Sequence, residues 1–470
     1  MVQQRETGQN GKQEYRQALR FLENRTDYER MVSIPYGEMG QNLGRLKRFA
    51  AFLGISRRVP TIHIAGTKGK GSTALLLEKG LRGCGYRTGL FTSPHLCRYE
   101  ERFALDGVPC SPGDFAKTLL EIERRLHDFD KADPCKTPFS RFELSVIAAL
   151  LLFEEKKADF IILETGLGGR IDATNICSPS LCILTSLGYE HQAQLGKTLA
   201  EIAAEKGGII KPHVPVVSGI GLGFENIPSE KEIADLPEFL KERTVTAETL
   251  RAGIEVIRKM AAEKEAPLIE IESIDPDVAQ EAAGMIGDAQ KRNLQIAVTV
   301  LRELAKTGLF LGKREDLLRS ISKTTLPARG QILRRNPIWL LDGAHTRDSA
   351  AALARTLSTI DATRKTLVFA ALADKDVLGM LWELLPQFDH VLLTEIPGSP
   401  RRLEADRLFT MAAVVLGHHH ENVRPKIEKA PDLRRILHRL KQLQATELVC
   451  FTGSFSLAAE VTAFLGKETG

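Results

Sequence analysis

Short apolar runs, separated by stretches with helical spacing, dominate the first part of the chain. Each run is long enough for one buried strand and ends in glycine or turn-forming residues. The runs occupy residues 59–66, 86–96, 158–169, 180–188 and 214–220. Helical spacing of apolar residues fills most of the intervals between them. Alternating strands and helices predict an α/β domain built on a mainly parallel sheet.

A second, shorter series of the same kind begins near Ile338. Its predicted strands lie at residues 338–345, 366–372, 390–396 and 447–454. The stretch TTLPARGQILRRNP (324–337), which has proline at both ends, is predicted to contain the linker. We therefore predict a larger domain over residues 13–327, a linker over 328–337 and a smaller α/β domain over 338–470.

Three other stretches have different patterns. The first twelve residues are polar and are expected to be disordered, whereas residues 13–60 are expected to be helical and charged. The longest apolar stretch, LSVIAALLLF (144–153), is about half a bilayer span and predicts a buried helix. Residues 221–240 have no clear period and are expected to form a surface excursion.

Composition narrows the class of protein. The 470 residues exceed one ordinary core and suit two or three domains. A net charge of +4, from 64 basic and 60 acidic residues, argues against nucleic-acid or membrane binding. Seven scattered cysteines without a C-x-x-C pair suit a reducing compartment. The polar beginning of the chain does not resemble a signal peptide, so we expect a cytoplasmic protein.

The loop between the first predicted strand and helix, within HIAGTKGKGSTALL (63–76), has the composition of a phosphate-binding site. Its glycines allow backbone N–H groups to converge on phosphate oxygens, and the helix N-terminus adds a partial positive charge. Lys70 can reach the terminal phosphates, and Ser72 or Thr73 can offer a hydroxyl to Mg²⁺. The loop departs from the strict G-x-x-x-x-G-K-[ST] pattern because Gly71 follows Lys70. A simple glycine-rich turn is the alternative.

The doubled G-T-x-G-K form of this loop resembles the Mur ligase superfamily. The glycine after the lysine resembles its folylpolyglutamate synthase/dihydrofolate synthase branch. Further similar blocks are FTSPHL (91–96), LETGLGGRIDATN (163–175), SLGYEHQAQLGKTLAEIAAEKGGIIKP (186–212) and FTGSFSLAAEV (451–461). The resemblance covers roughly residues 15–465. It implies a P-loop ATPase domain of the Mur-ligase type and a C-terminal Rossmann-like glutamate-ligase domain.

The resemblance also implies roles for individual residues. The implied ATP contacts are Gly66, Thr67, Gly69, Lys70, Gly71, Ser72, Asn293, Arg329 and Asp342. The implied Mg²⁺ ligands are Ser93, Glu164 and His191, and the implied pterin contacts are Phe142, Arg170 and Asp172. The implied catalytic residues are Lys70, His345 and Lys206, the last as a carbamylated lysine.

Two of these roles agree with the chemistry of the residues. Glu164 stands at the C-terminal end of an apolar strand, where ligands gather in open α/β sheets, and a hard carboxylate suits Mg²⁺. A partly buried lysine has a lowered pKa, reacts with CO₂ and becomes an anion. Without the resemblance, His191 could equally be a hydrogen-bonded structural residue. Lys206 could equally be an ordinary surface lysine.

Four positions depart from the family pattern. Glu190 stands where aspartate is usual, Ala328 where glycine is commoner, and Thr346 where asparagine is usual. Arg141 is also unexpected beside the implied pterin contacts. We expect Glu190 to tune the site rather than to abolish its reaction, and Ala328 and Thr346 to leave the reaction class unchanged.

The resemblance implies an ATP- and Mg²⁺-dependent ligase. It would join L-glutamate to a folate or dihydropteroate carboxylate through an acyl phosphate, and we expect it to act as a monomer. A Mur-type ligase for another acid, a nucleotide-dependent switch or kinase, and a degenerate binding protein are the alternatives. Cell-wall Mur ligases usually have a larger domain before the loop, where this chain has only about 60 residues.

Overall fold

The computed structural model describes residues 2–31, 42–56, 58–135, 137–282, 287–322, 324–399, 401–419 and 423–468. The chain forms two compact units, and each contains segments that are separated in the sequence. The first unit comprises residues 1–227, 245–281 and 292–323. The second comprises residues 228–244, 282–291 and 324–470.

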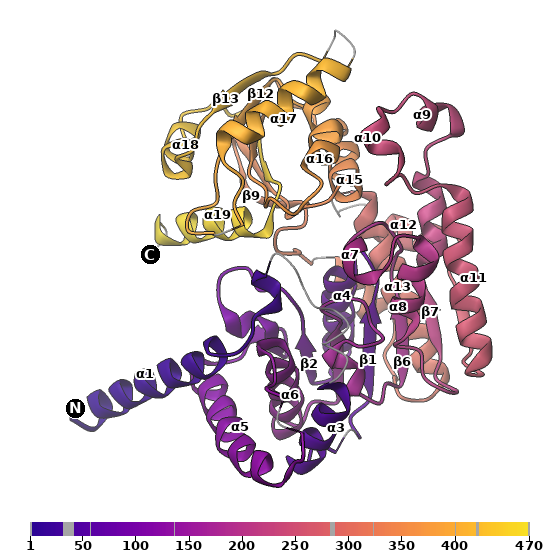
Figure 1. Cartoon of the computed structure of the whole chain (residues 1–470), viewed down its shortest axis with the longest axis vertical. Coiled ribbons are helices and arrows are strands. Elements are labelled where there is room, and N and C mark those ends of the chain that lie inside the picture. Colours follow the sequence, from indigo (N-terminus) through magenta and orange to yellow (C-terminus); the bar gives the residue numbers. More distant parts are fainter. Residues whose placement is uncertain are drawn as a thin grey trace. The chain divides into compact units, whose positions relative to one another are not determined.

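The first unit is built on an eight-stranded sheet with the order β4-β3-β2-β5-β1-β6-β7-β8. Strands β2, β1, β6 and β7 of this sheet are labelled in Figure 1. Its strands are β1 Thr61–Ala65, β2 Thr88–Phe91, β3 Phe103–Leu105, β4 Val108–Pro109, β5 Phe160–Glu164, β6 Leu181–Leu184, β7 Val216–Ser218 and β8 Leu268–Glu270. All pairs are parallel except those that β3 makes with β2 and β4. The prediction of a mainly parallel sheet is confirmed.

Helices cover both faces of this sheet. The helices whose residues lie wholly or mainly in the first unit are α1 Val2–Glu23, α3 Leu43–Phe52, α4 Lys70–Gly83, α5 Pro112–Ala132, α6 Arg141–Glu155, α7 Gln192–Leu195, α8 Leu199–Gly207, α11 Ala247–Glu263, α12 Pro276–Glu281, α13 Asp288–Lys306 and α14 Arg314–Ser322. Thr88 donates to Glu78 of α4, whereas a Cβ on Gly89 would lie 2.4 Å from Phe153 of α6. Successive strand residues point to opposite faces, so α4 and α6 lie on opposite sides of β2.

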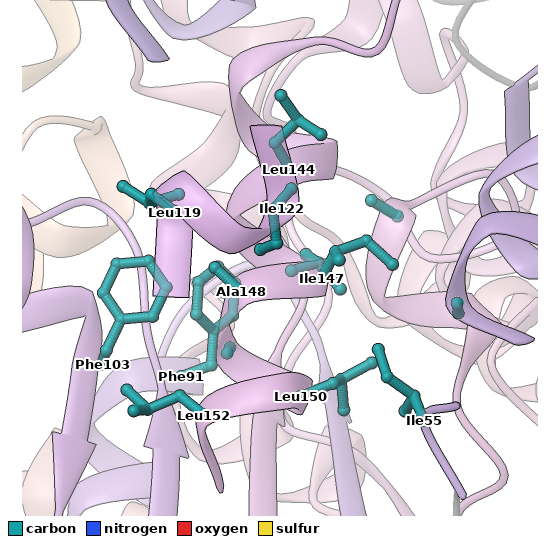
Figure 2. Packing of buried hydrophobic residues seen from close by; sticks show 14 of the residues in the cluster. Ile55, Phe91, Phe103, Leu119, Ile122, Leu144, Ile147, Ala148, Leu150 and Leu152 are labelled. Atoms are coloured by element: carbon teal, nitrogen blue, oxygen red, sulfur yellow. The ribbon is translucent and has the colours of Figure 1, made fainter. Parts of the chain in front are cut away.

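The largest hydrophobic cluster of this unit packs around α6, and Figure 2 shows part of it. A helix that is apolar on every side is expected to be buried, and ten residues of α6 are buried. Phe91 and Phe103 of neighbouring strands meet there with ring centroids 5.7 Å apart. Ser140 and Glu143 form a capping box that begins α6. The prediction of a buried helix over 144–153 is confirmed.

The second unit contains a six-stranded sheet with the order β13-β12-β11-β14-β10-β9. Its strands are β9 Gln331–Arg335, β10 Ile338–Leu341, β11 Lys365–Phe369, β12 His390–Leu393, β13 Lys426–Lys429 and β14 Leu448–Thr452. Its helices are α9 Glu230–Ala234, α10 Glu238–Lys241, α15 Arg347–Ser358, α16 Val377–Leu384, α17 Ala405–His418, α18 Leu433–Leu440 and α19 Phe455–Glu468. All strand pairs are parallel except β9 with β10. Residues of α15, α16 and α17 form one buried cluster with this sheet.

The structure differs from the predicted boundaries in three places. Residues 2–12 belong to α1 instead of being disordered. Part of the predicted linker is strand β9, which pairs with β10 as an edge of the second sheet. Residues 228–244 and 282–291, expected in the larger domain, group with the second unit. In the described residues, no helix is long and apolar enough to cross a membrane.

Candidate functional site

The loop between β1 and α4 requires glycine at two positions. Gly69 has a φ of +85° at the N-cap of α4, and a Cβ there would lie 2.3 Å from Asn293 Oδ1. A Cβ on Gly66 would lie 1.9 Å from Thr185 Oγ1. Larger residues would clash at both points, so the backbone of the loop stays open beside the helix N-terminus. The predicted ATP contacts from Gly66 to Ser72 therefore lie on one strand–loop–helix turn.

The segment after β6 holds this loop in place. Ser186 accepts from Thr67 N at 2.9 Å through its carbonyl and from Lys68 N at 2.8 Å through its hydroxyl. Thr185 Oγ1 donates to Lys68 O at 2.7 Å. No role for Thr185 and Ser186 was predicted from the sequence. Their only sequence signal was their place near the end of the apolar run 180–188.

Two lysine side chains converge inside the loop. Lys70 Nζ and Lys206 Nζ each donate to Gly66 O at 3.0 Å. Lys206 is 5% exposed, and burial, followed by the charge of Lys70, lowers its pKa to about 7. A large fraction of the Lys206 side chain is therefore a neutral amine at neutral pH, which is the form that reacts with CO₂.

A carboxylate lies against the first turn of α4. Glu164 ends β5 and is 5% exposed, and its Oε2 accepts from Ser93 N at 3.1 Å. A Cβ on Gly71 would lie 3.2 Å from the same oxygen. The structure thus brings two of the three predicted metal-binding residues, Ser93 and Glu164, to the carboxyl end of the sheet beside the phosphate loop.

The third predicted metal-binding residue, His191, has a φ of +54° at the N-cap of α7. Its Nε2 lies 3.7 Å from Glu190 Oε1. Among the described residues, no group of three or more His, Cys, Asp or Glu side chains is placed to hold a metal ion. The Glu164 carboxylate beside the phosphate loop is an oxygen ligand of the kind that Mg²⁺ takes together with substrate phosphates and water.

Glu190 bridges the phosphate loop and His191. Its Oε2 pairs with Lys68 Nζ at 2.9 Å while its Oε1 faces His191. We expect Glu190→Asp to raise the KM for the metal–ATP complex about tenfold, because the shorter side chain cannot reach both partners. Initial rates at varied MgATP measure this, and the turnover number is expected to stay within about twofold. An unchanged KM would contradict the bridging role.

The residues predicted to contact the pterin, and the nearby Arg141, each contact a different group in the structure. Phe142 packs on Phe91 with ring centroids 5.8 Å apart, and its ring lies where a Cβ on Gly166 would be. The guanidinium of Arg170 is held by Glu205, with Nη2 2.7 Å from Oε1. The unexpected Arg141 pairs with an aspartate, with Nη1 2.7 Å from Asp27 Oδ2.

Asp172 is 3% exposed and fully engaged within its own segment. Its Oδ2 accepts from the backbone N–H groups of Gly166 and Leu167, both at 2.9 Å. Its Oδ1 accepts from the backbone N–H of Thr174 at 2.9 Å and from the Thr174 hydroxyl at 2.5 Å. Burial raises the pKa of this carboxyl, while these donors oppose the shift. The geometry gives Asp172 a role in shaping the glycine-rich loop after Glu164.

We expect Asp172→Asn to lower the free energy of unfolding by about 2 kcal/mol. One amide oxygen and one NH₂ replace two acceptor oxygens, so at least one pair of buried donors loses its partner. Urea denaturation followed by circular dichroism measures the change. Glu205→Gln, at a more exposed position of the same region, is the matched control and is expected to cost less than about 1 kcal/mol. Equal losses in both variants would contradict this role.

The predicted residues of the second unit lie on two segments, Arg329 just before β9 and Asp342 and His345 after β10. Asp342 Oδ2 accepts from Gly330 N and its Oδ1 from Ala344 N, both at 2.8 Å. The guanidinium of Arg329 lies over the Phe455 ring, 4.3 Å from its centroid. Burial raises the pKa of Asp342, and the charge of Arg329 opposes this shift. Arg329 and Asp342 are therefore neighbours within this unit.

The two substitutions near this loop have structural explanations. Ala328 has a φ of +50°, in the left-handed region that favours glycine, which accounts for the commoner glycine there. Thr346 is the N-cap of α15 and forms a capping box with Ser349, and asparagine is another residue that favours this position.

His345 has a defined ring orientation. Its Nδ1 lies 2.8 Å from Gly343 O, and a carbonyl can only accept, so the ring donates through Nδ1–H. Its neutral form therefore presents Nε2 as an acceptor. The ring also packs on Phe455, with centroids 5.5 Å apart.

Comparison with known proteins covers most of the chain. The family described as Mur ligase, glutamate ligase domain matches residues 328–455. The dihydrofolate synthase/folylpolyglutamate synthase of Bacillus subtilis is 32% identical over 73% of this chain and 78% of its own length.

Solved structures show the same fold. Folylpolyglutamate synthase of Mycobacterium tuberculosis, complexed with ADP and AMPPCP, matches with a TM-score of 0.77 and 25% identity, over 97% of this chain and 99% of that chain. The bifunctional folylpolyglutamate synthase/dihydrofolate synthase of Yersinia pestis, complexed with AMPPNP and Mn ion, matches with a TM-score of 0.72 and 25% identity, over 90% of this chain and 93% of that chain. The predicted Mur-ligase fold is confirmed, and the chain belongs to the dihydrofolate synthase/folylpolyglutamate synthase family.

Proposed function

We propose that this protein is an ATP-dependent ligase that joins the amine of L-glutamate to the carboxylate of a folate or a dihydropteroate. The observation that carries the proposal is the convergence of Lys70 and Lys206 on Gly66 O, with Glu164 against the first turn of the same helix. The related structures from Mycobacterium tuberculosis and Yersinia pestis are complexes with ADP and AMPPCP and with AMPPNP, and the relatives are named dihydrofolate synthase and folylpolyglutamate synthase. We further propose that the enzyme acts as a monomer in the cytoplasm.

The proposed reaction has two steps. The substrate carboxylate attacks the γ-phosphorus of ATP, which releases ADP and leaves an acyl phosphate. The amine of L-glutamate then attacks the acyl carbon, phosphate departs, a proton is lost from nitrogen and the amide remains. Little covalent chemistry falls to the protein, so catalysis depends on positioning and on stabilisation of charge.

In this proposal the residues of the phosphate loop bind ATP. Lys70 leaves Gly66 O and offsets negative charge on the transferring phosphoryl group. Glu164, Ser93 and His191 would hold Mg²⁺, which would supply positive charge to offset that of the phosphate oxygens. Lys206, once carbamylated, is an anion that orients the cation or Lys70.

The remaining assignments follow the same proposal. Arg329, Asp342 and Asn293 contact ATP, and His345 acts as an acceptor near the reacting groups. Phe142 of α6 and Arg170 contact the pterin, and Asp172 holds the loop that carries Arg170. Whether dihydropteroate, folate polyglutamates or both are substrates depends on these contacts.

The test is glutamate-dependent release of phosphate from ATP, measured with dihydropteroate and tetrahydrofolate in parallel. Release with both assigns a bifunctional enzyme, and release with one assigns the branch. Chelation with EDTA is expected to abolish release, and Mg²⁺ to restore it. ATP binding without release for either acceptor would overturn the proposed substrate class and point to another carboxylic acid. ATP hydrolysis that does not depend on glutamate would indicate a nucleotide-dependent switch instead.

A further inference from the structure

A cavity of about 260 Å³ lies in the second unit, away from the loop that carries Asp342. Thr366, His390 and Lys426 line it, and they are partners in the register of β11, β12 and β13. Partnered residues of adjacent strands point to the same face of a sheet. All three stand at the beginning of their strands, whereas Asp342 follows the end of β10. Because these strands are parallel, the cavity and Asp342 lie at opposite ends of the sheet.

One side of the cavity is apolar. Leu392, two residues after His390 on the same face, lines it together with Leu440 and Leu443. Leu440 ends α18, and Leu443 follows in the turn that leads to β14. This wall suits the apolar part of a small molecule.

The polar side of the cavity is basic. Arg364, Lys426 and Arg439 line it together with a single carboxylate, Glu428. Glu428 Oε1 accepts from Arg439 Nη1 at 2.7 Å, and its Oε2 lies 3.4 Å from His390 Nε2. Within the described parts of the chain, Arg364 and Lys426 make no ion pair. Their two charges are therefore available to a ligand.

His390 lines the cavity as a polar but uncharged side chain. Burial, followed by the charge of Arg364, lowers its pKa, so the ring is neutral at pH 7. The groups that face it are Arg364, Arg439, Lys426 and Glu428, which together leave a net charge of two positive units. The C-terminal end of α18 adds only about half a negative charge, which does not cancel this excess.

We propose that this cavity binds a compact organic anion, whose phosphate or carboxylate head pairs with Arg364 and Lys426 and whose small apolar body contacts Leu440 and Leu443. Ligand pockets for larger molecules usually measure about 300–1,000 Å³, so this cavity suits a molecule smaller than a nucleotide or a folate. The site is separate from the ligation chemistry. Its occupant does not compete with ATP at the phosphate loop.

The test is isothermal titration calorimetry on the full chain with saturating ADP, which occupies the nucleotide site. The probes are phenyl phosphate, benzoate, inorganic phosphate and phenol. We expect phenyl phosphate or benzoate to bind, and whichever binds more tightly identifies the head group. The Arg364→Gln/Lys426→Gln double variant is expected to bind it at least tenfold more weakly. Lys429→Gln is the matched control, because Lys429 lies on the same strand outside the cavity and pairs with Asp406.

Three results would overturn the proposal. The first is that neither phenyl phosphate nor benzoate binds the unaltered protein. The second is that the double variant binds the anion as tightly as the unaltered protein does. The third is that phenol binds as tightly as the two anions. Inorganic phosphate binding as tightly as phenyl phosphate would overturn the role of the apolar wall. The double variant is expected to keep full ligase activity, so these outcomes are distinct from a failure of the proposed function.

Discussion

Lys70→Ala is expected to lower the rate of glutamate ligation about a thousandfold while the protein stays folded. The Lys70 side chain lies in the loop, with its ammonium 3.0 Å from Gly66 O. In the proposed mechanism this cation stabilises the negative charge on the transferring phosphoryl group. Removing one preorganised donor of this kind typically costs a factor of 10² to 10³ in turnover. Glutamate-dependent phosphate release measures the effect.

The control for this variant is Lys79→Ala, a partly exposed position on the same helix. Its ligation rate is expected to stay within about twofold of the unaltered protein. Thermal unfolding of both variants checks that the fold is retained. Near-normal turnover of the Lys70 variant would remove this residue from the proposed mechanism.

Lys206→Arg is expected to lower the ligation rate at least about a hundredfold, even though arginine is also a long basic side chain. Only a neutral amine forms a carbamate, and a guanidinium stays protonated at neutral pH. The pKa of Lys206 is lowered to about 7 from an ordinary value of 10.5. The side chain is therefore protonated below pH 7 and increasingly neutral above it. Activity that depends on the carbamate is expected to fall as the pH drops through 7.

Two measurements check this expectation. The ligation rate is compared in buffer depleted of CO₂ and in buffer supplemented with bicarbonate, at pH 6 and pH 8. Supplementation is expected to raise the rate of the unaltered protein and to leave the Lys206→Arg variant unchanged. The exposed Lys197→Arg is the control. A Lys206→Arg variant with the normal rate would rule out the carbamate.

The central strands of both sheets were predictable because they are buried on both faces. β1, β5 and β6 are buried at every position, which produces the continuous apolar runs seen in the sequence. The edge strands β4 and β13 have no such run, because their residues are exposed or only partly buried. They were missed for this reason. β9 was assigned to the linker because prolines flank it.

Parts of the candidate site made by residues close together in the sequence could be predicted. Contacts between residues far apart in the sequence could not. The glycine spacing placed the loop and Lys70 directly. The contacts of Thr185 and Ser186 with Lys68 join residues more than 100 positions apart, and no period marks them. The engagement of Asp172 by four donors was likewise invisible, since it depends on how the loop closes.

The second unit is assembled from separate chain segments, and this limits the order in which its parts can fold. Arg347 Nη1 donates to Leu240 O at 3.2 Å and to Thr244 Oγ1 at 2.8 Å, across 107 and 103 residues. During synthesis from the N-terminus, residues 228–244 emerge long before Arg347 exists. Residues 228–244 therefore cannot form these hydrogen bonds until Arg347 and the sequence around it have left the ribosome. A fragment that begins at residue 324 would lack this piece altogether, so its Arg347 would lose both of these acceptors.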